Sequence, residues 1–301
     1  MLGRMKMSTQ EALDAYDTFS SRIFSKRNRK KTPDHGLTQM YKATKLEKTV
    51  KELVAQHSDG VKMADSRQLN ERGRSFVCAK FQDEHRMTTC FRTYPVQHDQ
   101  YSHIDIWEAA RATTAAPLYF KPMTITNSDG LPRRFIDGAI GCNNPSERLL
   151  EEADLLYGKR RKLGCVVSLG TGDKPQELRE TASGIQGTLS CGMSLALVMK
   201  EITVDCEETH ARVKKKFENF PHAYFRFNVA GGAVDIKLQD WDKIGLLKER
   251  TNAYLQSDDA KTMINDLVKV LLQESPNRGL TLGHIGEEDR IEVHIILLID
   301  T

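Results

Sequence analysis

Apolar positions at helical spacing open the chain. Ser8 and Glu11 have the S-x-x-E spacing of a capping box, which predicts that a helix begins there. Apolar side chains then recur every three or four residues, namely Leu13, Tyr16, Phe19, Ile23 and Phe24. The helix is expected to end near Ser25. After a turn-rich stretch at residues 32–36, a second apolar stripe predicts a helix around residues 46–54.

Alternating and short apolar runs replace this spacing in the middle of the chain. Four strands are expected, at residues 75–81, 88–94, 118–125 and 133–136. Polar turn sequences at 82–86 and at Asn127-Ser128-Asp129-Gly130 join them in pairs. Between the two pairs, an Ala-rich helix at residues 105–115 is expected to stop before Pro117.

The second half alternates strands and helices. Helices are expected from Pro145 to Tyr157, where Gly158 ends the run, and at residues 194–216, 240–255 and 259–272. Strands are expected at residues 164–169 and 224–229; the first is fully apolar, as in a mostly parallel sheet. Trp241 and Leu246 are expected to point inward. Residues 291–299 are either a strand or a foreign extension. This order predicts a layered α/β fold.

Composition narrows the class of protein. The chain has 301 residues, enough for one large domain or two, and its net charge is only +3. Nothing in that charge requires a nucleic-acid partner. The local basic run at residues 26–31 is expected to be a solvated loop, with a contact for anionic lipid or another polyanion as the alternative. No apolar run approaches the ~18–20 residues that span a bilayer, and the first residues do not resemble a signal peptide.

Cysteine and histidine spacing bears on metals and on the compartment. Six cysteines are scattered without paired spacing, which indicates reduced thiols and a cytoplasmic protein. The nine histidines show no ligand spacing, so neither a metal nor another cofactor is expected.

Asp137 is the candidate for chemistry. It is expected at the end of a strand, where open α/β sheets place reacting groups. Gly138 after it is expected to supply backbone freedom for a sharp turn. A partly buried carboxylate there could act as a general base. From the local sequence alone, an aspartate that only caps its Asp-Gly turn is the favoured alternative.

The other residues singled out from the sequence are expected to be structural. Arg111 is expected to bind backbone carbonyls near its helix, with substrate contact as the alternative. Asn143, Asn144 and Pro145 are expected to shape a turn and to cap the next helix. Gly170-Thr171-Gly172 could be a phosphate loop, but a lone G-x-G is weak, and a tight strand-end turn is favoured.

Three strings in order carry a family resemblance: WEAARATTAAPLYF from Trp107, FIDGAIGCNNP around Asp137, and VVSLGTG ending at Gly172. Together they resemble the patatin-like phospholipase family. YFRFNV at residues 224–229, the region around Asp240-Trp241 and the opening MLGRMKMSTQEALDAY extend the resemblance to roughly residues 1–275. The expected domain boundary therefore lies at residue 275, with a tail of unknown role at 276–301.

The resemblance implies a layered patatin-like fold, with a mostly parallel sheet flanked by helices, and a lipid acyl hydrolase that uses a Ser–Asp dyad. No calcium-binding loop is visible in the sequence, so a calcium-independent reaction is expected. The serine of that family lies in a Gly-x-Ser-x-Gly elbow, and a Gly-rich loop forms the oxyanion hole. Asp137 of Asp137-Gly138-Ala139 matches the dyad aspartate, the proton acceptor. The implied partners are a lipid or acyl-ester substrate and, as an open option, a membrane surface.

The sequence departs from the family at the nucleophile. No Gly-x-Ser-x-Gly and no Gly-rich oxyanion loop occurs in the 301 residues. Ser194 has an incomplete motif, and Cys142 lies on the loop of the expected base, so neither is expected to be the nucleophile. We therefore expect that the first strands of the sheet are missing, that the sequence is part of a longer chain, and that it is inactive alone. The alternative is a non-catalytic interaction module.

Overall fold

The computed structural model of the chain describes residues 1–30, 39–58, 60–65, 73–83, 88–172, 195–232, 236–272, 280–283, 292–293 and 296–299. The chain forms two compact units. The first contains Met1–Gly141, Gln186–Val198 and Lys237–Ile244, and the second contains the remaining residues.

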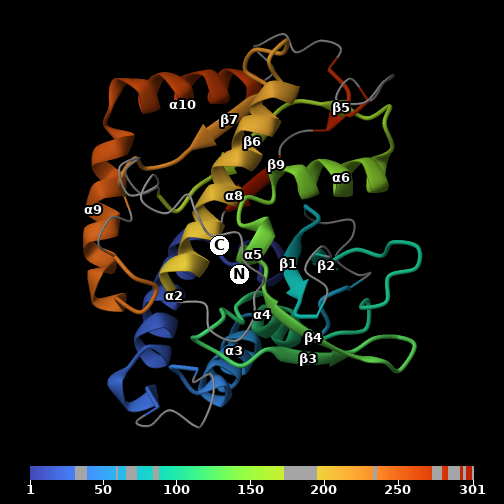
Figure 1. Cartoon of the computed structure of the whole chain (residues 1–301). Coiled ribbons are helices and arrows are strands. Elements are labelled where there is room, and N and C mark those ends of the chain that lie inside the picture. The colour runs from blue at the N-terminus through green and yellow to red at the C-terminus, as the bar shows by residue number, and fades with distance from the viewer. Residues whose placement is uncertain are drawn as a thin grey trace. The chain divides into compact units, whose positions relative to one another are not determined.

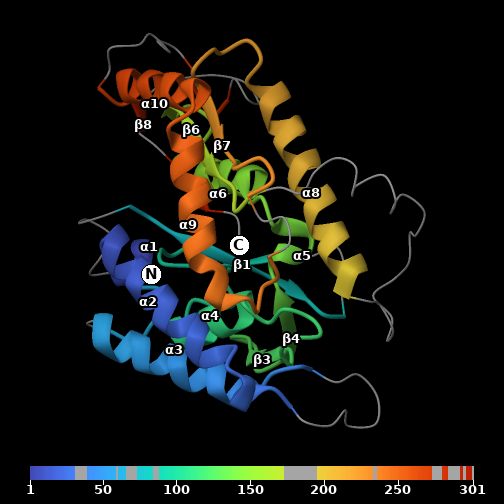
Figure 2. The same ribbon diagram turned by 90° about the vertical axis from the view of Figure 1, so that its left-hand side faces the viewer.

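Helices near the N-terminus form one layer of the first unit. They are α1 (Leu2–Met5), α2 (Thr9–Ile23), the short 3-10 turn η1 (Lys26–Asn28) and α3 (Ala43–His57). The predicted capping box is confirmed: Glu11 N–H donates to Ser8 Oγ (3.2 Å), and Ser8 N–H donates to Glu11 Oε2 (2.8 Å). Helices α2 and α3 lie side by side (Figures 1 and 2) and share a core that includes Ile23, Leu46 and Val50.

The sheet of the first unit is antiparallel throughout. Its strands are β1 (Phe76–Phe81), β2 (Thr88–Arg92), β3 (Met123–Thr126) and β4 (Pro132–Asp137), in the order β2-β1-β4-β3. The expectation of one mostly parallel sheet is therefore wrong for this unit. Strands that follow each other through short polar turns pair antiparallel, because a parallel pair needs a long crossover.

Helix α4 (Ile106–Thr113) packs on this sheet. Their shared core contains Phe91, Ala109, Ala112 and Phe135, each with less than 2% of its surface exposed. The helix ends before Pro117, as predicted. The strand expected from residue 118 begins only at Met123, since residues 117–119 form a turn.

The second unit contains the parallel strands. Strand β6 (Val166–Leu169) lies between β7 (Tyr224–Phe227) and β9 (Ile296–Ile299), and both pairings are parallel. Residues 292–293 form β8 (Glu292–Val293), parallel to β5 (Lys162–Leu163). The apolar run at 291–299 thus contributes strands to the unit, which decides between the two interpretations of it.

The helices of the second half agree with the sequence pattern in their positions, except for the short helix at residues 139–142, which was not predicted. They are α5 (Ala139–Cys142), α6 (Ser146–Tyr157), α8 (Leu195–Lys216), the 3-10 turn η3 (Trp241–Lys243), α9 (Ile244–Leu255) and α10 (Asp258–Leu271). Gly158 ends α6 at a φ of 75°, a left-handed value that suits glycine.

Trp241 and Leu246 do not point inward. Their exposed fractions are 42% and 38%, and no residue of α9 is buried. Trp241 lies in η3, and a 3-10 turn has a shorter period than an α-helix, so helical spacing does not apply to it. The prediction is therefore wrong for both side chains.

Two expectations stay predictions: the domain boundary at residue 275 and the missing first strands. Among the described residues, no helix combines the length and the apolar character that crossing a bilayer requires.

Candidate active-site carboxylate

Asp137 is the last residue of β4, and its backbone is held from two sides. It lies opposite Ala79 of β1 in the antiparallel register. Its own N–H donates to the carbonyl of Ala115, which follows α4 (3.2 Å). The strand end therefore has a fixed position relative to both the sheet and the helix that packs on it.

The position of Gly138 requires glycine because there is no room for a β-carbon. A β-carbon on Gly138 would lie well under 3.0 Å from the carbonyl of Cys78 in β1. That carbonyl is itself held, because Thr113 Oγ1 donates a hydrogen bond to it. Gly138 does not have a positive φ, so the expected reason, backbone freedom, is wrong. The close approach of β1 explains the glycine instead.

The Asp137 carboxylate is buried, and few hydrogen bonds offset the loss of its hydration. Oδ1 accepts a hydrogen bond from Ala139 N–H (2.8 Å), the contact of a turn cap. Desolvation nevertheless raises the pKa of Asp137 from 3.8 to about 7, and the bond to Ala139 offsets only part of this effect. The residue as a whole is half-buried, whereas its carboxyl group is surrounded by protein atoms. In the described part of the chain, no cation lies within 4 Å of this carboxylate. It can therefore gain or lose a proton near neutral pH.

Arg111 connects α4 to the segment that leads into β3. Its side chain is buried, and Nη2 donates to the carbonyl of Lys121. The guanidinium also lies 6.0 Å from the ring of Phe120. Burial lowers the pKa of Arg111, although an arginine stays charged at any ordinary pH. These contacts hold α4 against the segment that precedes β3, the strand that pairs with β4.

Asn143, Asn144 and Pro145 lie at the start of α6, in the second unit. Asn144 Oδ1 accepts hydrogen bonds from Ser146 N–H (3.2 Å) and Ser146 Oγ–H (2.6 Å). Its Nδ2 donates to the carbonyl of Cys206 (3.3 Å). Pro145 is the N-cap residue and makes no side-chain hydrogen bond. Both asparagines are buried, and the hydrogen bonds of Asn144 fix the path of the chain into α6.

The Gly170-Thr171-Gly172 turn after β6 is closed by its own chain. Gly170 N–H donates to the carbonyl of Phe227 (2.7 Å), and Gly172 N–H donates to Asn228 Oδ1 (2.9 Å). Two amides that a phosphate would need are thus occupied. Gly172 has a φ of 102°, which only glycine adopts readily. A tight strand-end turn describes this segment.

Ser194 and Cys142 are the two residues that the sequence analysis considered and rejected as nucleophiles. Ser194 lies outside the described residues. Cys142 is a buried cysteine, with 9% of its surface exposed, that forms no disulfide. Among the described residues, no group of three His, Cys, Asp or Glu side chains could hold a metal ion.

Lys80 is a neighbour of the Asp137 turn that sequence reasoning missed. It is 8% exposed, and a β-carbon on Gly141 would lie 2.9 Å from its Nζ. Gly141 therefore suits its position for space as well as for its φ of 86°. A charged residue within an otherwise apolar strand was the available signal, because strands bury alternate positions.

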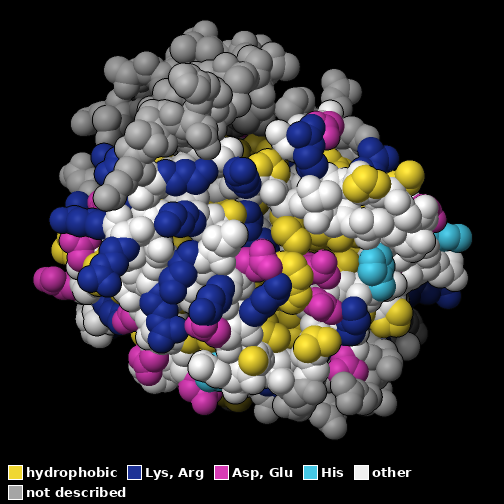
Figure 3. Space-filling model, turned by 90° about the horizontal axis from the view of Figure 1, so that it is seen from below, with side chains coloured by type: hydrophobic (Ala, Val, Ile, Leu, Met, Phe, Trp, Pro, Cys, Tyr) yellow, Lys and Arg dark blue, Asp and Glu magenta, His cyan; other side chains and the backbone are white. Residues whose placement is uncertain are grey.

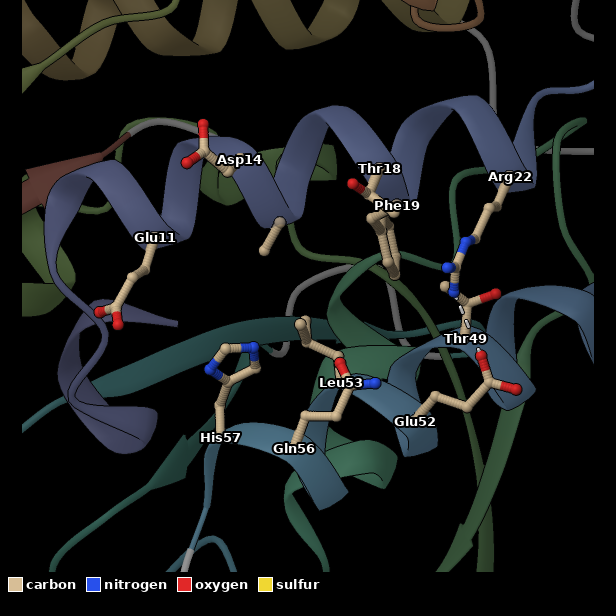
Figure 4. Close-up of a pocket in the computed structure, with 11 residues that line it drawn as sticks. Glu11, Asp14, Thr18, Phe19, Arg22, Thr49, Glu52, Leu53, Gln56 and His57 are labelled. Carbon is tan, nitrogen blue, oxygen red and sulfur yellow. Dashed lines mark hydrogen bonds and ion pairs between the residues drawn. The ribbon is translucent and has the colours of Figure 1, made fainter.

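A separate groove lies between α2 and α3 (Figure 4). It has a volume of about 310 Å³, and its walls include Phe19, Leu53 and His57. Arg22 reaches across it to Glu52 (3.4 Å). None of the residues singled out from the sequence as site candidates lines this groove.

Comparison with known proteins agrees with the resemblance. Residues 3–150, which include Asp137, match the family model described as patatin-like phospholipase. Patatin-like phospholipase 1 of Plasmodium falciparum (isolate NF54) is 29% identical over 171 residues, covering 52% of this chain and 25% of that protein. Calcium-independent phospholipase A2-gamma of Homo sapiens is 30% identical over 170 residues, covering 56% of this chain and 20% of that protein.

A plant relative gives a similar match. Phospholipase A I of Arabidopsis thaliana is 31% identical over 144 residues, covering 48% of this chain and 10% of that protein. The matched region thus spans a quarter or less of each of these three relatives. Through residues 3–150, the chain belongs to the patatin-like phospholipase family.

Proposed function

We propose that this chain supplies the proton-accepting carboxylate of a lipid acyl hydrolase, and that this carboxylate is Asp137. The observation that carries the proposal is a strand-end aspartate, within the family segment, whose burial raises its pKa to about 7. A general base works best when its pKa lies near the operating pH. A solvated turn aspartate would stay ionised and would be a weak base at neutral pH.

The free oxygen of Asp137 defines its role in the reaction. Oδ1 is occupied by Ala139 N–H, so Oδ2 is the oxygen that accepts the proton of the serine hydroxyl. As serine Oγ attacks the acyl carbonyl, its proton moves to Oδ2, and then to the oxygen of the departing alcohol. Water next gives a proton to Asp137 and attacks the acyl-serine carbonyl; as the bond to serine Oγ breaks, Asp137 returns the proton to Oγ, which releases the fatty acid and restores the serine.

The serine in this scheme is not one of the 301 residues, because no Gly-x-Ser-x-Gly occurs among them. We propose that it lies upstream in a longer chain and that the 301 residues alone are inactive. A fluorophosphonate probe, which labels activated serines, is expected to leave the 301-residue protein unlabelled. Labelling that disappears in Asp137→Ala would contradict this part of the proposal.

A non-catalytic interaction module is the second candidate. The observation in its favour is the bond from Ala139 N–H, because a turn cap needs no other role for Asp137. The two candidates differ in what happens when the charge of Asp137 is removed at constant shape.

The test is the Asp137→Asn substitution in the protein expressed with its upstream coding sequence. Turnover of an acyl ester is expected to fall by about 10²–10⁴-fold, the usual contribution of general base catalysis. Asp129→Asn is the matched control, because Asp129 is an exposed turn aspartate on the same sheet, between β3 and β4. Its turnover is expected to stay unchanged. Equal turnover in wild type and Asp137→Asn would leave Asp137 as a turn cap.

Two further properties belong to this proposal. We expect a calcium-independent reaction, so a calcium chelator should not change turnover. We also propose a cytoplasmic location, on the basis of cysteines that lack paired spacing.

A further inference from the structure

Six cations gather where the chain enters α3. Two segments contribute them, and backbone contacts join these segments. Lys30 N–H donates to the carbonyl of Met40 (3.0 Å), and Lys42 N–H donates to the carbonyl of Asn28 (3.2 Å). Arg29 and Tyr41 form an antiparallel bridge between them. The α3 basic surface, as we call it, consists of Lys26, Arg27, Arg29, Lys30, Lys42 and Lys45.

These charges are not neutralised by neighbours. For the six cations, the described part of the chain offers no carboxylate within 4 Å. The next lysines of α3 differ, because Lys51 pairs with Glu47 (2.6 Å) and Lys48 with Glu52 (3.9 Å). Four of the six side chains are exposed, and Lys30 and Lys45 are half-buried. The positive field therefore extends into solvent.

The start of α3 adds to this field. Most helix starts carry acidic or hydroxyl side chains, which satisfy the free N–H groups and oppose the positive end of the helix dipole. Helices α2, α4 and α10 follow this rule, with Glu11, Glu108 and Asp258 in their first turns. Helix α3 has Lys42 as its N-cap, no side-chain cap and no acidic residue in the first turn.

We propose that the α3 basic surface binds the anionic surface of a lipid bilayer. Lysine and arginine side chains near a bilayer are attracted to its acidic headgroups without needing a shaped pocket. Figure 3 shows the molecule from below relative to Figure 1. On this face, which includes α3, Lys and Arg side chains gather over the left half. The choice of lipid over another polyanion rests on the proposed acyl hydrolase function.

The attraction comes from this surface and not from the whole chain. The net charge of the protein is only +3, so a diffuse attraction to polyanions is weak. The six cations of the α3 basic surface exceed that total, so the remaining charges of the chain sum to −3. The binding is therefore expected to depend on these residues and to weaken as salt screens them.

The test is flotation of the 301-residue protein with vesicles, which needs no catalytic serine. Pure phosphatidylcholine vesicles are compared with vesicles that contain about one third phosphatidylserine. The variant carries Lys26→Gln, Arg27→Gln, Lys42→Gln and Lys45→Gln. The wild-type protein is expected to partition onto the acidic vesicles, and the variant to lose more than about tenfold of this partitioning.

A control variant removes the same number of charges from the second unit. Lys159, Arg160, Lys214 and Lys215 are exposed, and within the described residues no carboxylate lies within 4 Å of them. Their change to Gln is expected to alter partitioning less than about twofold. Circular dichroism and thermal melting of both variants establish that each is folded.

Three results would overturn the proposal. They are equal binding to acidic and neutral vesicles, an equal loss in the control variant, and tighter binding to a duplex RNA than to the acidic vesicles. Since flotation does not depend on hydrolysis, its result stands apart from the Asp137→Asn test. An active enzyme that ignores acidic vesicles would overturn this inference alone.

Discussion

Two strands of this protein end in glycine-marked turns, and the two turns do opposite things. At the end of β4, Gly138 lets the Cys78 carbonyl approach, and the Asp137 carboxylate keeps a single hydrogen bond. At the end of β6, Asn228 Oδ1 occupies the space beside Gly170 and binds Gly172 N–H. The first turn leaves the buried Asp137 carboxylate with few hydrogen bonds, whereas the second turn forms hydrogen bonds to its own backbone amides.

The comparison shows that a glycine after a strand does not by itself indicate a site. What differs is the neighbour that requires the glycine: rigid backbone at Gly138 and a side-chain end at Gly170. A carboxylate with one hydrogen bond stays a proton acceptor near neutral pH, while in the turn beside Asn228 the amides of Gly170 and Gly172 are already hydrogen-bonded within the chain.

Gly138→Ala should have the largest effect on stability. Its β-carbon would meet the Cys78 carbonyl, which is held in the β1–β4 pairing, so the two strands must separate. We expect a loss of more than about 3 kcal/mol in the free energy of unfolding, measured by urea denaturation. Gly73→Ala is the control, because a β-carbon there meets nothing within 4 Å and should change stability by less than about 0.5 kcal/mol. A loss as small as that for Gly138→Ala would refute the close-approach explanation.

The pH dependence of stability tests the carboxylate directly. Because the folded-state pKa of Asp137 is raised from 3.8 to about 7, its protonated form favours folding, and this contribution is complete below pH ~4. As pH rises from about 4 to 7, the unfolded chain ionises first, and stability falls by up to about 1.4 kcal/mol per pH unit. Asp137→Asn should lack this loss.

The measurement is the free energy of unfolding of both proteins across that range. Relative to Asp137→Asn, the wild type should lose about 3 kcal/mol between pH 4 and pH 7. A constant difference between the two proteins would mean that the carboxylate is as well solvated in the fold as in the unfolded chain.

Gly170→Ala should cost less than Gly138→Ala, although the space is as tight. The obstructing atoms are the ends of the Asn228 and Arg226 side chains, which can move where a strand carbonyl cannot. We expect a loss of about 1–2 kcal/mol. If both alanine variants lose the same amount, the distinction between rigid and adaptable neighbours is wrong.

Asn228→Ala gives the smallest effect and sharpens the same point. It removes the hydrogen bond to Gly172 N–H, worth about 1 kcal/mol. It also removes the atom nearest to a β-carbon at Gly170, so Gly170→Ala should cost less in the Asn228→Ala background than in the wild type. Additive losses in a double-mutant cycle would show that Asn228 does not set the tight fit.

Local signals predicted much of this fold. The capping box at Ser8, the stop before Pro117 and the glycine that ends α6 at Gly158 depend on a few neighbouring residues, and all three are confirmed. The apolar run around Val166 was also interpreted correctly, because a strand paired in parallel on both edges buries both faces.

Predictions that needed long-range information failed. The short polar turns of the first sheet indicate antiparallel strand pairs, whereas the family resemblance implied a mostly parallel sheet. The structure has the antiparallel pairs. Trp241 was misplaced because a 3-10 turn shifts the helical period. The need for glycine at position 138 depends on the carbonyl of Cys78, 60 positions earlier in the chain, which no local pattern reveals.

The same distinction between local and long-range information applies to the candidate site. An Asp-Gly pair after a strand indicated Asp137, but its weak compensation is a property of the folded neighbourhood. Lys80 was missed for the same reason, since only the pairing of β1 with β4 brings it to the Asp137 turn.

The titration of Asp137 tests the central claim most directly. Carbon-13 NMR of the side-chain carboxyl, assigned by its absence in Asp137→Asn, gives its pKa in the folded protein. The structure predicts a value of about 7, as required of a base that accepts a serine proton at neutral pH. A value near 3.8 would contradict the account, because it would describe a solvated turn aspartate that differs little from any other.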